Sequence, residues 1–512
     1  MVSDPNEWLD RAARDYPDRL FLSTPEGRRY SYAALLAGSG RIASALRGLG
    51  VEAGDRVAVR VEKSAEAVFL YVACLRSGAA FVPVNTAYSP AEVEYFLRDS
   101  QPRVAVVDPD DLAVPGPVDL VENIVTLGPD GSGTLVELAR RADPEFEPPS
   151  DLDADSLASI VYTSGTTGRS KGAMLTRGNL ASNATTLADS WRFSGTDVLL
   201  HVLPLFHVHG LFAAINTVLA SGSGMVLMPS KFDATAALRH LSEVTVFMGV
   251  PTHYTRLLQE QGLDRQSTAR IRLFVSGSAP LLAETHQEFS RRTGHEILER
   301  YGMTETLMNT SNPYEGARVP GSVGPPLPRI AVRVINPQTG AIETTPDAIG
   351  TLEIKGPNVF AGYWQDEEKT RSEFTADGWF KTGDLGRIDR NGYVYIVGRV
   401  KDLVISGGYN VYPKEVESEL DAIPGVAESA VFGVPHSDLG EGVTAAVVLK
   451  AGANLSEADI LNAVRSRLAR YKVPKRILLV AELPRNTMGK VQKNVLRATN
   501  ASLYAKVADH SR

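Results

Sequence analysis

Short apolar runs alternate with stretches of helical periodicity through the first third of the chain. Runs at residues 56–59, 81–84 and 104–107 are typical of buried strands, and helical patterns fill the intervals between them. Gly78 ends one of these helices, and residues 89–92 (Ser-Pro-Ala-Glu) form a capping box that begins another. Repeated strand–helix–strand units predict mostly parallel sheets covered by helices, which is the α/β class.

The alternation continues to about residue 320, after which shorter strands are separated by Gly and Pro. Candidate strands are 198–205, 225–228, 246–248 and 273–275, then 331–335, 350–355 and 392–397. We therefore predict a large α/β part over residues 1–320 and a smaller β-rich, barrel-like part over residues 321–400. Together these form an N-terminal domain over residues 1–400.

A domain boundary is expected near Lys401. Residues 401–512 carry their own signals, with strands near 430–432 and 443–449 and a helix over 456–471. This length is sufficient for a small α+β domain.

Composition is ordinary for a soluble globular protein. Of the 512 residues, 43 % are hydrophobic and 22 % are charged, and the length implies two or more domains. A net charge of −7 argues against a general nucleic-acid binder, although it allows a local basic pocket for phosphates. The single Cys74 excludes an internal disulfide, and its apolar neighbours predict a small buried side chain.

The start of the chain is polar and lacks the apolar core of a signal peptide. No run approaches the ~18 apolar residues of a membrane span. We therefore expect a cytoplasmic protein with no membrane partner. An organellar form whose transit peptide has been removed stays open.

The densest chemical signal is the segment 162–172, with the sequence YTSGTTGRSKG. Its Gly residues let the backbone approach a ligand closely, while backbone N–H groups, hydroxyls, Arg169 and Lys171 offer donors and positive charge to an anion. The apolar run before it predicts a strand, so the loop is expected at a strand end, where α/β folds bind ligands. The spacing matches neither a Walker A loop nor a dinucleotide-binding Gly motif, and a flexible surface loop is the alternative.

Four later segments combine charged residues with tight turns. They are residues 299–306 (ERYGMTET), 381–386 (KTGDLG), 398–417 (GRVKDLVISGGYNVYPKEVE) and 484–493 (PRNTMGKVQK). Taken singly, each has an ordinary explanation: Glu305 could be solvated, Asp384 could cap its own turn, and Lys490 could be a surface lysine. Glu305 could equally bind Mg²⁺, a hard cation that prefers oxygen ligands and shares them with phosphate.

Together, and in this order, the five segments resemble the acyl-adenylate-forming superfamily. That superfamily contains acyl-coenzyme A synthetases, peptide-synthetase adenylation domains and beetle luciferases. The resemblance runs from about residue 10 to residue 493, and chance agreement of an ordered set is negligible. It implies a ligase that joins a carboxylic acid first to AMP and then to coenzyme A. ATP and coenzyme A would be co-substrates, and Mg²⁺ the cofactor.

The resemblance also implies a role for each matching residue. The β- and γ-phosphates of ATP would be enclosed by Thr163, Ser164, Gly165, Thr166, Thr167, Gly168 and Lys171. The adenine and the acyl group would be flanked by Ser278, Ala279, Pro280, Glu299 and Tyr301. The α-phosphate would meet Thr304, Mg²⁺ would meet Glu305, and the ribose hydroxyls would meet Asp384 and Arg399.

The C-terminal domain would act in both half-reactions. Lys490 would bridge the substrate carboxylate and the α-phosphate during adenylation, and so offset the repulsion between two anions. The domain would then rotate about a hinge at Lys401, so that Gly407 and Gly408 line the coenzyme A tunnel. Acetylation of Lys490 would remove its charge and switch the enzyme off, a hypothesis that a fully active acetylated form would refute.

The acid is indicated by Arg300, which stands where most relatives have a small or neutral residue. An Arg in an apolar acyl pocket is costly unless it meets an anion, so it predicts a second carboxylate on the substrate, bound as a fork. His207 lies in the acyl-pocket segment and could assist. The alternatives are a salt bridge between Arg300 and Glu299, and a satisfied helix-end position for His207.

The wider cluster around Arg300 resembles the malonyl-coenzyme A synthetase subgroup. Substrate contacts are then also expected from Ser276, Val208 and Met308. The last two would approach the α-carbon and govern tolerance of methylmalonate.

We therefore predict ATP-dependent ligation of malonate to coenzyme A through malonyl-AMP, with methylmalonate as an additional candidate acid. A synthetase for another short or aromatic acid is the second hypothesis. The third, a non-catalytic nucleotide or acyl-AMP binding protein, is disfavoured by the intact Lys490, Glu305 and Asp384. The sequence does not distinguish a monomer from a homodimer.

Overall fold

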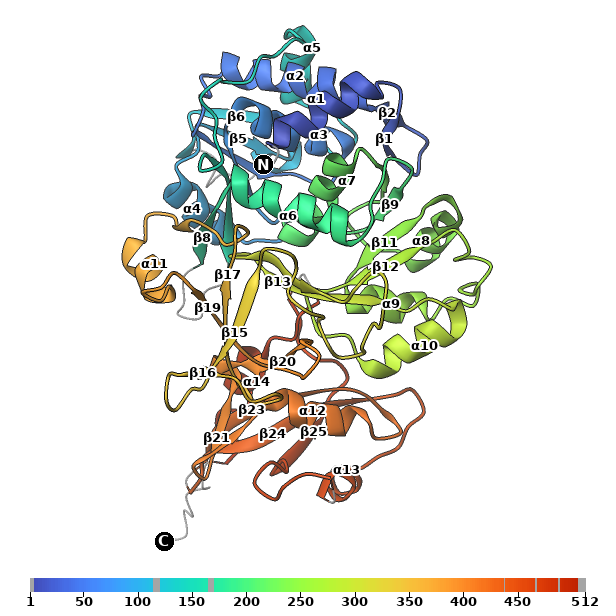
Figure 1. The fold of residues 1–512 in the computed structure, drawn as a ribbon, viewed down its shortest axis with the longest axis vertical. Helices are drawn as coiled ribbons and strands as arrows, with labels where there is room; N and C mark the ends of the chain where they lie inside the picture. The colour runs from blue at the N-terminus through green and yellow to red at the C-terminus, as the bar shows by residue number, and fades with distance from the viewer. Residues whose placement is uncertain are drawn as a thin grey trace. The chain divides into compact units, whose positions relative to one another are not determined.

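The structure is a computed structural model that describes residues 4–113, 120–163, 170–436, 438–465, 467–486 and 489–504. The chain divides into two compact units. The first comprises Met1–Val332 and Ile354–Phe380, and the second comprises Arg333–Glu353 and Lys381–Arg512. Figure 1 shows the elements of both units.

The first unit contains two large sheets. Its strands are β1 (Leu20–Ser23), β2 (Arg29–Ser31), β3 (Arg56–Arg60), β4 (Ala80–Pro83), β5 (Val104–Val107), β6 (Asn123–Thr126), β7 (Leu157–Thr163), β8 (Lys171–Thr176), β9 (Val198–His201), β10 (Gly224–Leu227), β11 (Val246–Gly249), β12 (Leu273–Ser276), β13 (Leu298–Met303), β14 (Leu307–Ser311) and β18 (Gly362–Tyr363). Its helices are α1 (Pro5–Asp15), α2 (Tyr32–Gly48), α3 (Ala65–Ser77), α4 (Pro90–Ser100), α5 (Thr134–Arg141), α6 (Arg177–Ser190), α7 (Asn216–Ser221), α8 (Ala234–His240), α9 (Pro251–Leu257), α10 (Ala283–Thr293) and α11 (Glu367–Glu373), with short helices η1 (Pro109–Ala113), η3 (His209–Ile215) and η4 (Leu241–Glu243).

Parallel pairing dominates both sheets, as the sequence predicted. One sheet has seven strands in the order β18-β8-β7-β4-β3-β5-β6, and the other has eight in the order β14-β13-β12-β11-β9-β10-β1-β2. In the second of these, the six strands from β13 to β1 are parallel to their neighbours, and β14 and β2 are antiparallel edges. Figure 1 shows α8, α9 and α10 along the strands β11 and β12 of this sheet.

The local signals in the sequence explain where several helices begin and end. The capping box at Ser89 and Glu92 is present and begins α4. The side chain of Ser64 caps α3, and Gly78 ends it with a left-handed backbone at φ +73°. Cys74 on α3 is buried, as expected.

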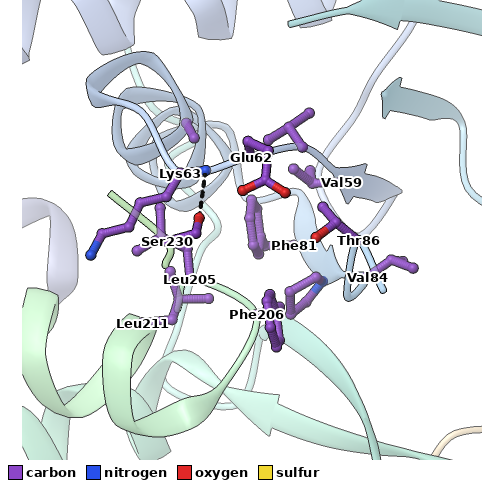
Figure 2. A pocket seen from close by; sticks show the side chains of 13 residues that line it. Val59, Glu62, Lys63, Phe81, Val84, Thr86, Leu205, Phe206, Leu211 and Ser230 are labelled. Atoms are coloured by element: carbon purple, nitrogen blue, oxygen red, sulfur yellow. Dashed lines mark hydrogen bonds between the residues drawn. The ribbon is translucent and has the colours of Figure 1, made fainter. Parts of the chain in front are cut away.

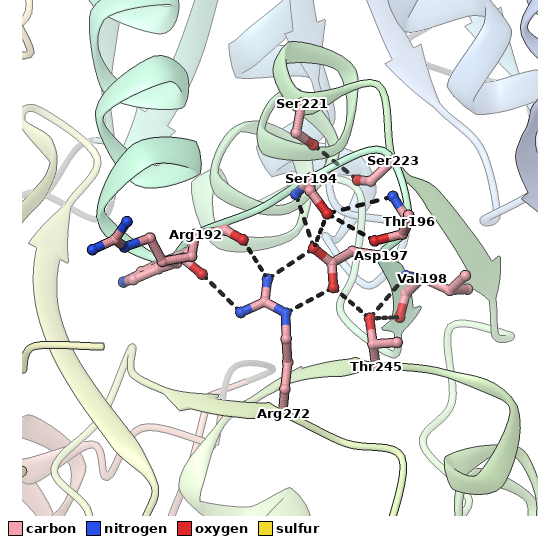
Figure 3. A network of polar contacts seen from close by, with 10 residues as sticks. Arg192, Ser194, Thr196, Asp197, Val198, Ser221, Ser223, Thr245 and Arg272 are labelled. Carbon is pink, nitrogen blue, oxygen red and sulfur yellow. Dashed lines mark hydrogen bonds and ion pairs between the residues drawn. The ribbon is translucent and has the colours of Figure 1, made fainter. Parts of the chain in front are cut away.

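A polar network holds the amino ends of three neighbouring parallel strands together (Figure 3). Asp197, Thr245 and Arg272 directly precede β9, β11 and β12. Arg272 donates to both carboxylate oxygens of Asp197, from Nε at 2.7 Å and from Nη2 at 2.9 Å. The Thr245 hydroxyl donates to Asp197 Oδ1 at 2.7 Å. The network fixes the amino ends of these strands and leaves their carboxyl ends for ligands.

The second unit contains the remaining elements. They are β15 (Ala331–Ile335), β16 (Ile342–Glu343), β17 (Gly350–Lys355), β19 (Phe380–Ile388), β20 (Val394–Arg399), η5 (Val400–Asp402), β21 (Val404–Ser406), β22 (Tyr409–Val411), α12 (Pro413–Asp421), β23 (Val426–His436), β24 (Gly440–Leu449), α13 (Glu457–Arg465), β25 (Arg476–Leu479) and α14 (Lys493–Thr499). A few residues at the ends of β15, β17 and β19 belong to the first unit.

Two sheets of five strands build this unit. One has the order β16-β15-β17-β19-β20, and the other has β22-β21-β24-β23 with β25 paired to β24. The first runs from edge to edge in the described part of the chain and does not close, so the β-rich part is an open sheet rather than a barrel. The predicted boundary near Lys401 does not coincide with the division into units, and the hinge there stays a prediction.

Some predicted elements differ in extent. The strand expected over 198–205 ends earlier, at His201, and the chain then turns through Pro204. The helix expected over 456–471 spans Glu457–Arg465. Residues 108–149 are rich in Pro, Asp and Gly, a composition typical of loops. The segment nevertheless includes β6, which pairs with β5, and the helix α5.

In the described part of the chain, no helix combines the length and the apolar character that crossing a membrane requires.

Candidate active site

The carboxyl ends of four parallel strands gather most of the predicted substrate residues. Register places Met248 of β11 beside His201 of β9, and Ser276 of β12 between Gly249 of β11 and Glu299 of β13. The segments that follow these strands carry His207, Val208, Ser278, Ala279 and Pro280. These carboxyl ends lie opposite the Asp197 network, and open α/β sheets bind ligands at the carboxyl ends of their strands.

Arg300 on β13 is a buried cation without a counter-charge. It is 3 % exposed, and its Nε and Nη2 atoms have no hydrogen-bond partner. Within the described chain no carboxylate pairs with it, and Glu299 instead accepts a bond from the Gly321 N–H at 3.1 Å. Desolvation lowers the pKa of the Arg300 guanidinium to about 9. The alternative of a salt bridge between Arg300 and Glu299 is therefore not what the structure has.

Gly277 provides the space in which the Arg300 guanidinium lies. A Cβ atom built on Gly277 would be 2.4 Å from Cζ of Arg300, which is closer than atoms can approach. Only Gly therefore allows the guanidinium to pack on the backbone at this point. Ser278, the next residue, holds a left-handed conformation at φ +70°, unusual for a residue other than Gly.

Arg272 shows what a structural arginine looks like in the same protein. Its guanidinium makes two bonds to Asp197 and two more to the backbone carbonyls of Trp191 and Arg192 (Figure 3). Arg300 lacks any comparable set of partners. The contrast leaves two buried donors of Arg300 without a partner among the described residues.

Two histidines and a serine at this edge also hold buried polar atoms without partners. These atoms are His207 Nε2, His209 Nε2 and Ser276 Oγ. Desolvation lowers the pKa of His207 to about 4. The pKa of His209 is also lowered, first by desolvation and then by the positive charge of Arg300. Both rings are therefore neutral at physiological pH, and they can donate or accept a hydrogen bond.

His209 was missed by the sequence analysis. The segment 205–210 (LFHVHG) contains two histidines, and spacing alone did not show which of them faces the site. His209 is fully buried at the start of η3, and its Nδ1 lies 3.2 Å from Ser278 Oγ. The helix η3 is a π-helix, a rare form that is frequent at functional sites.

Val208 and Met308 occupy the positions expected to line the acyl group, but their contact with substrate stays a prediction. Met308 is buried, and its backbone is held by Asn183, which accepts from the Met308 N–H at 3.3 Å and donates to its carbonyl at 2.9 Å. Val208 is half-buried immediately before η3.

A mostly apolar pocket borders the histidine segment (Figure 2). Leu205 and Phe206 line it together with Lys63, whose backbone N–H bonds to Ser230 Oγ at 3.4 Å. The buried Lys63 ammonium donates to the His201 carbonyl at 2.8 Å, and the His201 ring lies 2.9 Å from the Gly210 carbonyl. Contacts to His201 and Gly210 thus fix both ends of the segment that carries His207 and His209.

Two of the residues predicted to meet the α-phosphate and Mg²⁺ lie in a turn between β13 and β14. Thr304 and Glu305 form this turn. Glu305 is 7 % exposed, and its Oε1 accepts from the hydroxyls of Tyr363 at 3.2 Å and Thr163 at 3.5 Å. Two motifs that are 142 residues apart in sequence therefore meet at one carboxylate.

The Gly-rich loop joins two antiparallel strands. Thr163 ends β7 and is paired with Lys171, which begins β8. The predicted phosphate-binding residues between them, namely Ser164, Gly165, Thr166, Thr167 and Gly168, lie outside the described residues. Lys171 Nζ lies 5.6 Å from the Tyr363 ring centre, and desolvation followed by the charge of Lys369 lowers its pKa.

The predicted adenine segments occur at the ends of two adjacent strands. Ser278, Ala279 and Pro280 follow β12, while Glu299 and Tyr301 belong to β13. Tyr301 is half-buried, and its hydroxyl is 3.9 Å from the Met303 sulfur. Their proximity agrees with a shared site, while their roles stay predictions.

In the second unit, the predicted ribose residues are directly paired. Asp384 on β19 and Arg399 on β20 are partners in the ladder, and Arg399 Nε lies 3.0 Å from Asp384 Oδ1. Asp384 is nearly fully buried, whereas the Arg399 side chain is about one-third exposed. Lys401 lies in η5, directly after β20, and desolvation followed by the charge of Arg399 lowers its pKa.

Gly407 and Gly408 form the two-residue turn of the β21–β22 hairpin. Both have positive φ, +59° and +81°, as a type I′ turn requires. Ser406 and Tyr409 are paired on either side of them. The Gly-Gly turn expected from the sequence is confirmed, and its contact with coenzyme A stays a prediction.

Lys490 lies in the second unit with the paired ribose residues. Desolvation, followed by the charge of Arg399, lowers its pKa to about 8. The residue nevertheless has an exposed surface.

The fold and these motifs define an AMP-forming acyl-coenzyme A synthetase. A family model for AMP-binding enzymes matches residues 9–364, and a model for the C-terminal domain of these enzymes matches residues 415–490. The chain belongs to the AMP-binding enzyme family, and it is a ligase that uses ATP and coenzyme A as substrates. The resemblance found in the sequence is confirmed.

Several relatives act on different acids. The chain is 54 % identical to MatB from Rhodopseudomonas palustris, whose ATP-bound crystal structure it matches with a TM-score of 0.94 over 98 % of this chain and 100 % of that one. It is 38 % identical to the mitochondrial malonate–CoA ligase of Homo sapiens, over 96 % of this chain and 92 % of the relative. It is also 34 % identical to the long-chain-fatty-acid–CoA ligase of Bacillus subtilis, over 96 % and 94 %.

Replacing His207 should change how stability depends on pH. In the unfolded chain its pKa is near ~6.5, whereas in the folded protein it is about 4. Stability should therefore fall as pH drops through this window, because the unfolded state binds more protons. His207→Gln should reduce the fall by at most ~3 kcal/mol. Urea titrations at successive pH values measure this difference, and parallel curves for both proteins would contradict it.

Proposed function

We propose that this ligase activates malonate, forming malonyl-AMP and then malonyl-coenzyme A, with methylmalonate as a second substrate. The observation that carries this proposal is the buried Arg300 guanidinium with unpartnered Nε and Nη2 atoms. A buried cation is stable only when an anion compensates for its lost hydration. The carboxylate that is not adenylated would be that anion, held by two parallel N–H···O bonds.

The neighbouring groups support a small dianionic acid. His209 and His207 are neutral, so they can donate hydrogen bonds without adding to the charge at Arg300. Ser276 offers a further hydroxyl. Malonate and methylmalonate separate their carboxylates by one carbon. This short separation suits Arg300, which directly follows Glu299 of the predicted adenine segment on β13.

The residues around Glu305 fit a magnesium ion shared with ATP. Mg²⁺ prefers hard oxygen ligands and is usually bound by one or two carboxylates plus substrate phosphates. Glu305 offers a nearly buried carboxylate beside the Thr163 hydroxyl and near the base of the Gly-rich loop. Bound there, the ion would neutralise charge on the phosphates. Glu305 would orient it, and Thr304 would hold the α-phosphate.

The second unit would supply the groups that change between half-reactions. Asp384 and Arg399 would hold the ribose, and Lys490 would stabilise the two anions that meet during adenylation. Gly407 and Gly408 would then line the path of the coenzyme A thiol after rotation at Lys401.

Arg300→Ala should reduce kcat/KM for malonate by at least about thirtyfold, because truncating one partner of a buried charge pair costs ~2–5 kcal/mol. Activity with a monocarboxylate such as butanoate should fall far less. Steady-state pyrophosphate release measures both acids. An unchanged kcat/KM for malonate would exclude Arg300 as the carboxylate-binding residue.

A second variant separates the position of the guanidinium from its charge. Gly277→Ala keeps the charged Arg300 side chain, but the added methyl group fills the space that the guanidinium occupies. It should impair malonate use in the same way as Arg300→Ala. Arg291→Ala is the matched control, since Arg291 is an exposed residue paired with Glu288 on α10. A Gly277→Ala enzyme with normal selectivity for malonate would argue against this geometry.

Glu305→Gln should raise the Mg²⁺ concentration needed for half-maximal adenylation and lower the maximal rate by about tenfold or more. The physical reason is the loss of one anionic oxygen ligand. Titration of Mg²⁺ at fixed ATP gives both values. Glu288→Gln, on the surface of α10, controls for the change in net charge. The assignment fails if the two variants have the same Mg²⁺ dependence.

A panel of acids distinguishes the remaining hypotheses. Acetate, malonate, methylmalonate, succinate and benzoate under identical conditions should give the highest kcat/KM with malonate. A preference for acetate or benzoate would favour a monocarboxylate synthetase. A cytoplasmic location and acetylation of Lys490 stay predictions, and the names of the malonate–CoA ligase relatives of animals include a mitochondrial location.

A further inference from the structure

The turn that presents Lys490 is closed by its own backbone and by Asn486. The Asn486 N–H donates to the Lys490 carbonyl at 2.9 Å, and the Lys490 N–H donates to Asn486 Oδ1 at 2.9 Å. Gly489 donates back to the Asn486 carbonyl at 2.9 Å and has φ +72°. Arg485 and Val491 pair across the base of the turn. The backbone of Lys490 is thus fixed relative to Asn486.

One arginine connects this turn to the sheet of the second unit. Arg485 Nη1 donates to the Gly489 carbonyl at 2.5 Å, directly before Lys490. The Nη2 atom of the same guanidinium forms an ion pair with Glu428 on β23. Arg485 therefore links β23, an edge strand of its sheet in the described part of the chain, to the peptide unit adjacent to Lys490.

Apolar packing holds the chain on either side of the turn. Leu483 before it and Leu496 after it are both buried against Ala430 and Phe432 of β23. Beyond the turn, Lys493 lies 2.5 Å from the buried Glu417. The turn therefore stands on a rigid base, and its own orientation depends on the polar contacts of Arg485 and Asn486.

We propose that Arg485 and Asn486 are positioning residues for Lys490, and that they act in adenylation but not in thioester formation. The proposal rests on the proposed role of Lys490 in the first half-reaction. Holding Lys490 between two anions costs conformational entropy of its side chain and of the backbone that carries it. A turn that is already ordered removes the backbone part of this cost on binding. Small misplacement of a charged group lowers the rate of the step that it stabilises.

Separate measurement of the two half-reactions tests this proposal. Single-turnover pyrophosphate release from malonate and ATP, without coenzyme A, reports adenylation. Formation of malonyl-coenzyme A from preformed malonyl-AMP reports thioester formation. Arg485→Gln and Asn486→Ala should slow adenylation by about tenfold or more, with little change in KM for malonate or ATP. Thioester formation should keep its wild-type rate, and Arg485→Lys should recover part of the loss.

The control is Arg476→Gln, which removes another exposed ion pair of the same unit, Arg476 with Glu457 at 3.0 Å. It should leave both half-reactions unchanged. Equal losses in the two half-reactions for Arg485→Gln and Asn486→Ala, or wild-type adenylation by both, would overturn the proposal. A wild-type enzyme that releases no pyrophosphate with malonate would instead contradict the proposed substrate, and the same comparison would then be made with the acid it does activate.

Discussion

A buried positive charge without a partner is the constraint on which this site depends. Charges in the interior lose their hydration, and the loss is tolerated when hydrogen bonds and an opposite charge replace it. Arg272 has such replacements from Asp197 and two carbonyls, whereas Arg300 lacks partners at two nitrogen atoms. The surrounding fold must therefore hold Arg300 in place without neutralising it. An anionic ligand then finds a site that is already organised and poorly hydrated.

The architecture explains how the fold does this. Arg300 lies on a strand in a mostly parallel sheet, so its backbone is fixed by pairing with Ser311 on β14. The Asp197 network secures the amino ends of β9, β11 and β12 (Figure 3). Gly277 leaves room for the guanidinium, and the charge of Arg300 helps to keep His209 neutral. The paired polar groups of the Asp197 network thus lie at the amino ends of these strands, and the unpartnered atoms of Ser276 and His209 lie near the carboxyl ends.

Much of this could be predicted from the sequence because the relevant signals are local. The runs at β3, β5 and β12 and the cap of α4 depend on periodicity and on a few neighbouring residues. Arg300 and Glu305 stood out because they belong to ordered motifs that resemble a known family, and Arg300 departs from the small or neutral residue of most relatives. His209 could not be separated from His207, since two positions in one loop differ only in how the chain turns after β9.

Other features depend on contacts between distant residues and could not be predicted. The pairing of Thr163 with Glu305, and the open five-stranded sheet that begins with β16, follow from tertiary packing. The space above Gly277 is visible only once β12 and β13 lie side by side. The division of the chain at residues 333–353 and 381 likewise reflects strand pairing rather than any change in composition.

The most direct test of the account compares malonate with monomethyl malonate in the wild-type enzyme. The ester keeps the reacting carboxylate and adds a single methyl group, but it lacks the second negative charge. If Arg300 binds that charge, kcat/KM for the ester should be lower by at least about a hundredfold, because a buried group would be left unpaired. Equal kcat/KM values for the two acids would contradict the account.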